Sequence, residues 1–226
     1  MDTCQPASTN LLSSWEHQFQ QFFSQQNISD ASHDLSHFQR VWKTAQLLLK
    51  IEQQPANSLT ILAACYFHDI VVLPKNHPDR SKASRLAADK AITCLQQLQF
   101  PSLLYEGVHH AILAHSFSAQ ILPETREAKI VQDADRMEAL GAIGLARVFY
   151  TSGLLKQKMF DSHDPLAKQR PLDDKQYALD HFQLKLFNLA ETMQTEAGRI
   201  LAQKQTNILK LFVKQLSNEI IHGYSL

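Results

Sequence analysis

The sequence predicts an all-α protein with a single domain, and three observations lead to this prediction. Apolar side chains recur at spacings of three and four residues over long stretches, which is typical of helices with one buried face. Glycine is scarce, with 6 among 226 residues, and 8 prolines leave few turns for a many-stranded sheet. A chain of this length with 44% hydrophobic residues can bury one sizeable core, and no linker to a second core is obvious.

Five helices are predicted in the first half of the chain from apolar periodicity and from residues that suit helix ends. The second matches the helical period most closely, with Phe38, Val41 and Trp42 on one face. The third is almost wholly apolar and begins at Ser58, whose hydroxyl can cap its first turn. Pro101 suits the first turn of the fifth helix. The predicted ranges, to within a few residues, are 11–26, 33–53, 58–70, 81–98 and 101–115.

The second half of the chain predicts helices on either side of a polar loop. Residues 126–150 form either one long helix or two short ones. Residues 161–174 are rich in Asp and contain two prolines, so they predict a loop. Asp173 or Asp174 can cap the helix that follows. The two C-terminal helices are predicted at about 173–189 and 191–221.

The charges exclude several classes of protein. Lys and Arg number 22, as do Asp and Glu, so there is no single-sign field to draw nucleic acid or an anionic membrane. The longest apolar runs, such as residues 61–67, are too short to span a bilayer. The N-terminus lacks the basic and apolar pattern of a signal peptide. We therefore expect a cytoplasmic protein with no membrane partner and no dedicated nucleic-acid surface, in which Cys65 and Cys94 are reduced core residues.

The first chemical signal is the pair His68-Asp69 at the end of the apolar third helix. Such a helix should be buried, and polar groups at its end need partners because unsatisfied buried polar groups are costly. The pair is either a hydrogen-bonded closure of the helix or a pair of metal ligands. Adjacent residues on a helix point about 100° apart, so both can reach one ion only where the helix ends.

Two more segments supply groups of the same kind. His37 lies four residues before Val41, along the edge of the apolar stripe of its helix, so its imidazole should face the core. Asp133 and Asp135 lie in the helical segment 130–140 and point about 200° apart, so one is expected to bind an ion and the other either to stabilise the helix or to support the ligand.

Two imidazoles and two carboxylates form a mixed nitrogen and oxygen ligand set. This set suits Mn²⁺, Fe²⁺, Co²⁺, Ni²⁺ or Zn²⁺, and Mg²⁺ is a further candidate. Four protein ligands leave room on the ion for water and for substrate oxygens. Hydrolysis needs this arrangement, because a metal acidifies bound water and polarises a phosphoryl oxygen.

The order of these residues resembles the H…HD…D pattern of the HD-domain superfamily, with His37, then His68-Asp69, then Asp135. Longer segments are similar to the YedJ-like group of small bacterial HD-domain proteins, and the similarity extends from about residue 12 to residue 220. These segments are ACYFHDI (64–70), AHSFS (114–118), IVQDADR (130–136) and LDDKQYALDHF (172–182).

The resemblance implies a fold and a ligand set. The fold is one HD-type helical bundle over residues 1–226, with a core at about 30–140 and the C-terminal helices at about 175–221 packed on it. The resemblance favours Asp135 over Asp133 as the last ligand and implies one divalent metal ion per chain. The implied ligands are His37, His68, Asp69 and Asp135.

The resemblance also implies an activity, that of a metal-dependent phosphohydrolase acting on a nucleotide or another phosphate ester or anhydride. The alternative is a non-catalytic HD-fold module that binds metal and nucleotide. A third class, a di-iron oxygenase, would need a second ion held by His110 or His115. Their spacing of five residues puts them about 140° apart on a helix, which disfavours that site. We instead expect His115 to face the substrate.

Several cations are candidates for contact with substrate phosphate. Arg40 lies almost one turn after His37, and Lys75 and Arg80 follow the HD pair in or beside a proline-containing loop. Arg offers a planar fork to phosphate and Lys a mobile point charge, while the alternative is that these are solvated surface charges.

Three further residues complete the candidate site. His181 and Lys185 lie one helical turn apart in a segment that resembles the YedJ-like group, and they are candidate substrate contacts. Asp34 either accepts a hydrogen bond from a ligating imidazole or stabilises the N-terminus of its helix.

Overall fold

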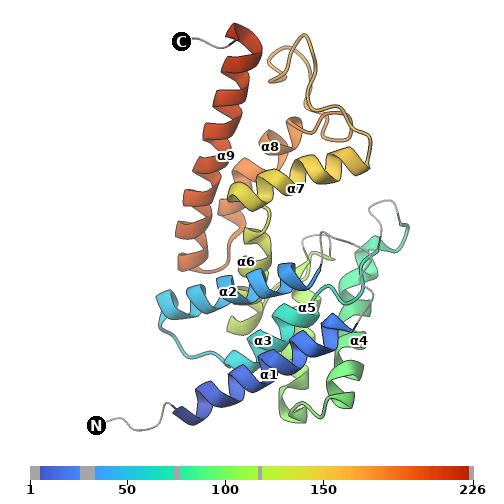
Figure 1. Cartoon of the computed structure of the whole chain (residues 1–226), viewed down its shortest axis with the longest axis vertical. Coiled ribbons are helices and arrows are strands. Elements are labelled where there is room, and N and C mark those ends of the chain that lie inside the picture. The colour runs from blue at the N-terminus through green and yellow to red at the C-terminus, as the bar shows by residue number, and fades with distance from the viewer. Residues whose placement is uncertain (1–5, 26–33, 74–76, 117–118, 224–226) are drawn as a thin grey trace. The chain divides into compact units, whose positions relative to one another are not determined.

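The computed structural model describes residues 6–25, 34–73, 77–116 and 119–223, and it confirms the all-α class (Figure 1). Among these residues the only β-type pairing is an isolated bridge between Lys158 and Tyr177. The chain divides into two compact units, residues 1–135 and 136–226, and each is described by itself. That the whole chain forms one domain stays a prediction.

The first unit is built from six helices of the described chain, the last of which continues two residues past the boundary. Short 3₁₀ turns at Arg80–Lys82 and Ser102–Leu104 precede the fourth and fifth helices. The helices are α1 (Pro6–Ser24), α2 (Leu35–Glu52), α3 (Ser58–Phe67), α4 (Ala83–Gln97), α5 (Tyr105–His115) and α6 (Arg126–Met137).

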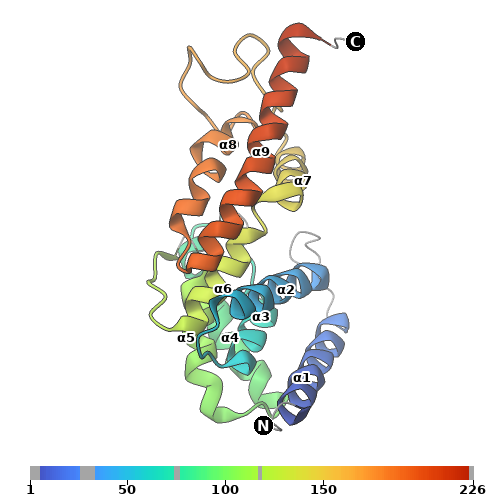
Figure 2. The ribbon, with the colours of Figure 1, turned by 90° about the vertical axis from the view of Figure 1, so that its left-hand side faces the viewer.

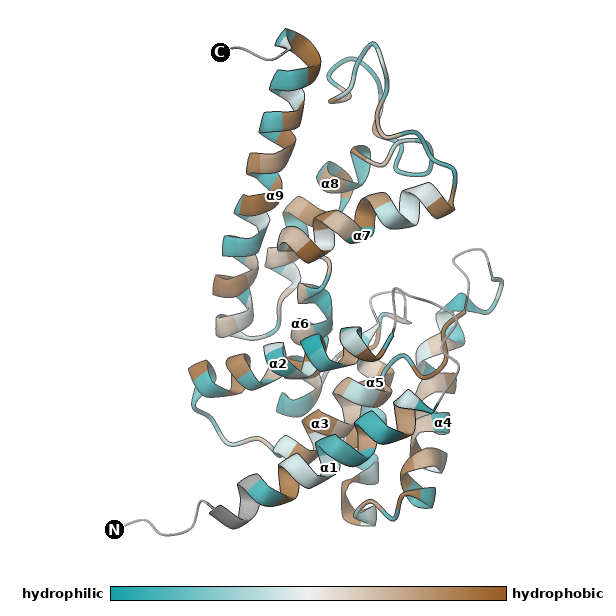
Figure 3. Cartoon of the chain, viewed as in Figure 1, coloured by the Kyte–Doolittle hydropathy of each residue, from teal (hydrophilic) through white to brown (hydrophobic). Residues whose placement is uncertain are grey.

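Helix α3 is the centre of the first unit. Every residue from Thr60 to Phe67 is buried, and the helix packs against α1, α2, α4 and α5. Its ribbon is among the most apolar in Figure 3. The aromatic rings of Phe19 and Phe67 meet edge to face, with 5.1 Å between their centroids. Burial of each such ring stabilises the fold by about 1.5–3 kcal/mol, and it also places the end of α3 in the interior.

Helix α1 is joined to this core by a polar contact as well. The Glu16 carboxylate accepts a hydrogen bond from Trp42 Nε1 at 3.1 Å and another from the Tyr66 hydroxyl at 3.3 Å. Trp42 and Tyr66 are large side chains with almost no exposed surface. Their polar atoms therefore need a partner, and Glu16 supplies it.

The predicted cap of α3 was one residue too late. Asn57 is the N-cap, and its side-chain oxygen accepts from the backbone N–H of Thr60 at 3.0 Å. Ser58 is the first helical residue. Both side chains suit a cap, so the sequence alone does not choose between adjacent positions.

The second unit contains α7 (Gly141–Leu154), α8 (Asp180–Leu184), the 3₁₀ segment η4 (Leu186–Thr192) and α9 (Glu196–His222). Of the two predicted alternatives for residues 126–150, the structure has two helices. Helix α9 is the longest, and both α7 and η4 pack against it (Figure 2). The core of this unit includes Phe182, Leu186 and Leu209, all buried.

The predicted helix at 173–189 was wrong at its start. The Asp173 carboxylate accepts from the backbone N–H groups of Lys175 and Gln176, which makes a turn, and α8 begins only at Asp180. Asp174 instead lies 2.8 Å from the Nδ1 atom of His181. An Asp side chain that bonds the backbone two or three residues ahead stabilises a turn as well as a helix cap, so the residue type fits both.

The prediction for the two core cysteines is confirmed. Cys65 and Cys94 are free and buried, as predicted. None of the described helices has the length and apolar content that a membrane crossing requires.

Candidate metal centre

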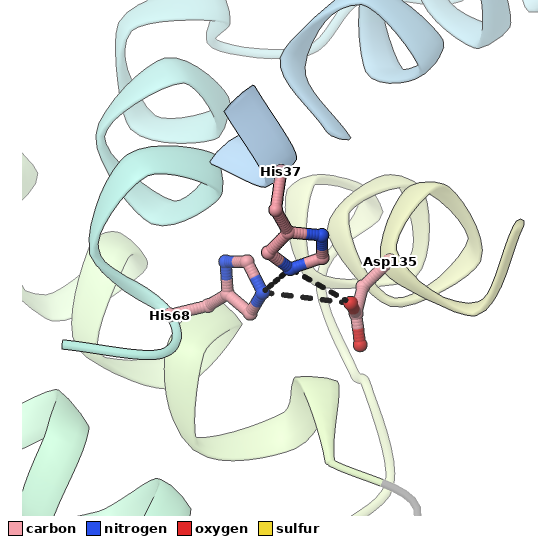
Figure 4. Close-up of side chains that lie close together, drawn as sticks. All are labelled: His37, His68 and Asp135. Atoms are coloured by element: carbon pink, nitrogen blue, oxygen red, sulfur yellow. Dashed lines mark hydrogen bonds and ion pairs between the residues drawn. The ribbon is translucent and has the colours of Figure 1, made fainter. Parts of the chain in front are cut away.

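Three side chains of the first unit converge in the buried space at the end of α3 (Figure 4). The Nε2 atoms of His37 and His68 lie 3.1 Å apart. The Oδ1 atom of Asp135 lies 3.7 Å from Nε2 of His37 and 3.5 Å from Nε2 of His68. Atoms bound to one ion at about 2.1 Å are separated by distances of this order, so the three atoms fit around a single cation.

Each of these side chains comes from the end of a helix or from its buried face. His37 lies in the first turn of α2, where Asp34 caps the helix by accepting from the His37 backbone N–H at 3.0 Å. His68 is the C-cap residue of α3. Asp135 lies near the end of α6. The prediction that the HD pair follows directly after the buried helix therefore holds.

The backbone fixes which nitrogen of His68 can bind an ion. Its Nδ1 lies 3.0 Å from the carbonyl oxygen of Cys65, three residues earlier. A carbonyl can only accept, so Nδ1 carries the proton, and in the neutral imidazole Nε2 presents its lone pair. That lone pair faces Oδ1 of Asp135 and Nε2 of His37, and these three atoms approach one another favourably only when a proton or a metal cation lies between them.

The electrostatic field at this point favours positive charge. Burial by itself would lower the pKa of His68, but the carboxylates of Asp69 and Asp135 raise it to about 9. Burial would likewise raise the pKa of Asp135, but its contact with His68 holds that pKa well below the usual range. A field that stabilises a proton on His68 also stabilises a divalent cation beside it.

Asp69 contacts a second histidine. Its Oδ2 lies 3.6 Å from Nε2 of His68, and its Oδ1 lies 3.4 Å from Nε2 of His115. His115 repeats the arrangement of His68, because its Nδ1 lies 2.5 Å from the carbonyl oxygen of Ile112. Among the described residues, Asp69 thus joins a second potential ligand group, formed with His68 and His115. The two groups share His68. Its Nε2 has a single lone pair, so His68 can bind an ion in only one of the two groups at a time.

The two carboxylates of α6 lie in different surroundings. Asp135 belongs to the first group and its side chain is 25% exposed. Asp133 is fully buried and belongs to neither potential ligand group. The separation expected from the helical period is therefore present.

The candidate phosphate-binding cations have other contacts. Arg40 donates from Nη1 to the Ser36 hydroxyl at 2.9 Å, and Ser36 donates to Asp34 at 2.7 Å. Arg80 donates to the carbonyl oxygen of Leu73. Lys75 lies outside the described residues, so its predicted contact with substrate stays a prediction.

Three other histidines of the described residues have partners that belong to neither ligand group. His109 pairs with Asp89 at 2.9 Å, and His110 accepts from the backbone N–H of Glu124 at 3.0 Å. His181 pairs with Asp174 in the second unit, which also contains Lys185. The predicted substrate contacts of His181 and Lys185 stay predictions.

Sequence reasoning did not identify the main-chain carbonyls that orient two imidazoles. The carbonyls of Cys65 and Ile112 lie three residues before His68 and His115, in the last turns of α3 and α5. A histidine placed after an apolar helical turn is the available sequence signal, since a carbonyl near the end of a helix lacks an intrahelical partner. Gln132 was also missed. It is buried and donates to the carbonyl oxygen of Ala114, next to His115, at 2.7 Å.

Several known proteins are similar to this chain. A family model of the HD domain matches residues 34–140. The protein YpgQ of Bacillus subtilis (strain 168) is 30% identical over 197 residues, which cover 84% of this chain and 85% of YpgQ. The match to YpgQ supports the bacterial group that the sequence resembles.

Two solved structures share the fold. An HD-superfamily hydrolase from Bacillus thuringiensis is 28% identical, with a TM-score of 0.69, and the alignment covers 92% of this chain and 97% of that one. A structure of Bacillus subtilis YpgQ in complex with ADP has a TM-score of 0.67, covering 95% of this chain and 97% of that one. Its identity in the structural alignment is 24%, so it is evidence for the fold alone. The chain therefore belongs to the HD-domain family.

Proposed function

We propose that this protein is a metal-dependent phosphohydrolase that acts on a nucleotide or on another phosphate ester or anhydride. The observation that carries the proposal is the convergence of His37, His68 and Asp135, with Asp69 adjacent, in an HD-family chain. When bound, a divalent ion there supplies Lewis-acid chemistry, which activates water and offsets negative charge on phosphate.

The protein's own residues contribute orientation and charge. The carbonyl of Cys65 fixes the His68 tautomer, so that Nε2 is available as a ligand. Asp69 and Asp135 add negative charge next to two imidazoles, which favours a divalent ion over a monovalent one. The side chains of Asp69 and Asp135 are 20% and 25% exposed, whereas His37 and His68 are almost fully buried. The exposed carboxylate edges are therefore where solvent and substrate oxygens would approach the ion.

The substrate class rests on the relatives. Bacillus subtilis YpgQ, which is 30% identical to this chain over 197 residues, has been solved in complex with ADP, and its sequence similarity supports a nucleotide as the proposed substrate. We propose Arg40, Lys75 and Arg80 as the cations that meet the phosphate groups, and His115, His181 and Lys185 as further contacts. Asp34 and Asp133 are proposed to support the ligands.

The proposal is tested with protein stripped of metal and reloaded with Mn²⁺. Hydrolysis of nucleoside mono-, di- and triphosphates and of simple phosphate esters is followed by phosphorus NMR, which identifies the bond that is cleaved. His68→Ala should abolish both metal retention and turnover with little change in helical circular dichroism. His109→Ala is the matched control, because it removes an imidazole that pairs with Asp89 and belongs to neither ligand group.

The same experiment separates the alternatives. Metal and nucleotide bound with no product from any substrate would contradict an enzyme and support the non-catalytic module. We propose one ion per chain, and the group formed by His68, Asp69 and His115 makes the stoichiometry worth measuring. Two irons per chain after anaerobic purification, with one lost in His115→Ala, would contradict the single-ion proposal.

A further inference from the structure

The second unit contains a pocket that the proposed reaction does not use. Its volume is about 330 Å³, within the range of small-molecule sites. Helix α9 supplies most of its wall, with contributions from η4 and from the loop before α8. Its lining residues are Leu166, Phe187, Lys210, Val213, Lys214, Ser217 and Asn218.

The floor of this lysine-rimmed pocket is apolar. Val213 is 9% exposed, and Leu166 and Phe187 are half-buried. The hydroxyl-bearing Ser217 is also buried, at 8% exposure. An apolar ligand body placed here would cover carbon surface that is otherwise in contact with water, and this would favour binding.

The rim carries two ammonium groups one helical turn apart, on Lys210 and Lys214 of α9. Among the described residues neither is part of an ion pair. The Lys210 ammonium lies 5.8 Å from the centroid of the Phe187 ring, above the pocket floor. Like charges at this spacing on a helix repel each other. A bound anion would relieve that repulsion, so the two lysines favour a negatively charged ligand.

The part of the pocket that Leu166 lines is held firmly, although it is a loop. Leu166 lies in a turn whose two ends are joined by Asp164, which accepts from the backbone N–H groups of Lys168 at 2.8 Å and Gln169 at 2.7 Å. The carbonyl of Leu166 itself accepts from Gln183 of α8 at 3.0 Å. The wall is therefore formed before any ligand binds, and little ordering would oppose binding.

The next anchor lies immediately after this turn. Arg170 donates two hydrogen bonds to the fully buried carboxylate of Asp180, at 2.6 and 2.9 Å, and its guanidinium lies 4.3 Å from the centre of the Tyr177 ring. The positive charge of Arg170 is thus neutralised in place. The ammonium groups of Lys210 and Lys214, in contrast, are available at the pocket.

We propose that the lysine-rimmed pocket binds a small organic anion with a compact apolar body, such as an aromatic carboxylate, sulfonate or phosphate. The apolar body lies on Phe187 and Val213, and the anionic group lies between Lys210 and Lys214. Every group in this site belongs to the second unit, so the site does not depend on the proposed metal chemistry.

The test uses the full chain and the aromatic sulfonate 1-anilinonaphthalene-8-sulfonate, whose fluorescence rises when it leaves water. Saturable binding to one site is expected. The double variant Lys210→Glu/Lys214→Glu should weaken binding at least tenfold. Lys204→Glu is the matched control, because Lys204 is an exposed lysine on α9 outside the pocket, and it should change affinity less than twofold. The neutral analogue N-phenyl-1-naphthylamine should bind more weakly and should not respond to either change.

Two results would overturn the proposal. One is binding by the double variant within twofold of the parent protein, and the other is an equal loss in Lys204→Glu, which would indicate a non-specific charge effect. If the charge reversal prevents folding, as judged by circular dichroism, Lys210→Gln/Lys214→Gln replaces it with the same expectation. The affinity for the sulfonate should be the same with Mn²⁺ and with a chelator. The binding result can therefore be interpreted even if the metal proposal fails.

Discussion

Helix α6 places two aspartates only two residues apart, yet it gives them different surroundings. Asp135 lies 3.5 Å from Nε2 of His68, whereas Asp133 is fully buried outside both potential ligand groups. A helix turns about 200° over two residues, so the two side chains leave it in nearly opposite directions. The helical geometry therefore separates Asp135, a candidate metal ligand, from Asp133, a residue that we propose to support the ligands.

The two roles predict different losses of metal. Asp135→Asn replaces an anionic ligand with a neutral amide and should abolish Mn²⁺ retention. Asp133→Asn should weaken Mn²⁺ binding about 10–100-fold, the usual effect of losing a residue that supports a ligand. Titration calorimetry with Mn²⁺ measures both. Equal loss in the two variants would show that α6 does not separate the roles.

At the scale of single elements, the start of α2 couples a helix cap to a candidate ligand. Asp34 accepts from the backbone N–H of His37 and from the Ser36 hydroxyl. These contacts help to hold its pKa below the usual value although partial burial opposes them. The side chain therefore stabilises the first turn of the helix that presents His37.

Two substitutions at Asp34 distinguish a cap from a support of the imidazole. Asp34→Ala removes the cap and should lower the free energy of unfolding by about 0.5–2 kcal/mol in urea titrations. Asparagine caps helices about as well as aspartate, so Asp34→Asn should keep stability, but it should lose about tenfold in Mn²⁺ affinity because the charge that we propose to support the ligand is gone. Unchanged Mn²⁺ affinity in a stable Asp34→Asn protein would contradict that role and leave Asp34 as a helix cap.

The loop before α8 should become less stable as the pH falls. The Asp161 carboxylate accepts from the backbone N–H groups of Asp164 and His163 and from the Tyr177 hydroxyl, which lowers its pKa to about 2. A carboxyl whose pKa falls on folding stabilises the folded loop above its unfolded pKa of about 4, and this contribution is lost as the pH falls toward 2.

Cleavage of this loop by pepsin should therefore rise between pH 4 and pH 2. Asp161→Ala removes the acceptor at every pH, so the variant should already be cleaved rapidly at pH 4. Asp89→Ala is a control that removes an exposed carboxylate from the first unit. Equal cleavage of the parent protein and Asp161→Ala at pH 4 would show that Asp161 does not hold the loop.

The elements also show what a sequence can and cannot predict. The ranges of α2 and α3 were predicted within a few residues, because long apolar periodicity is a strong local signal. The start of α8 was missed, because Asp173 serves a turn through the same hydrogen bonds that would cap a helix. The contact of His115 with Asp69 was also missed, because it depends on how α5 packs against α3, which local periodicity does not describe.

At the scale of the whole molecule, metal binding should stabilise the fold. All candidate ligands lie in the first unit, so an ion bound there stabilises the folded state by about 2.7 kcal/mol at 100 times its Kd. For a chain of this size that corresponds to an increase in Tm of about 2–4 °C per kcal/mol. If the whole chain forms one domain, as predicted, scanning calorimetry should show a single unfolding transition, and Mn²⁺ should raise its Tm. Two transitions, of which only one moves, would contradict a single domain.

We propose that one divalent ion is bound by His37, His68, Asp69 and Asp135. Anomalous diffraction at the manganese edge, from crystals grown with Mn²⁺, would locate this ion. We expect one strong peak per chain at about 2.0–2.3 Å from Nε2 of His37, Nε2 of His68 and a carboxylate oxygen each of Asp69 and Asp135. Protein shown by elemental analysis to hold one manganese per chain, with its anomalous peak away from these atoms, would contradict the proposed ligand set.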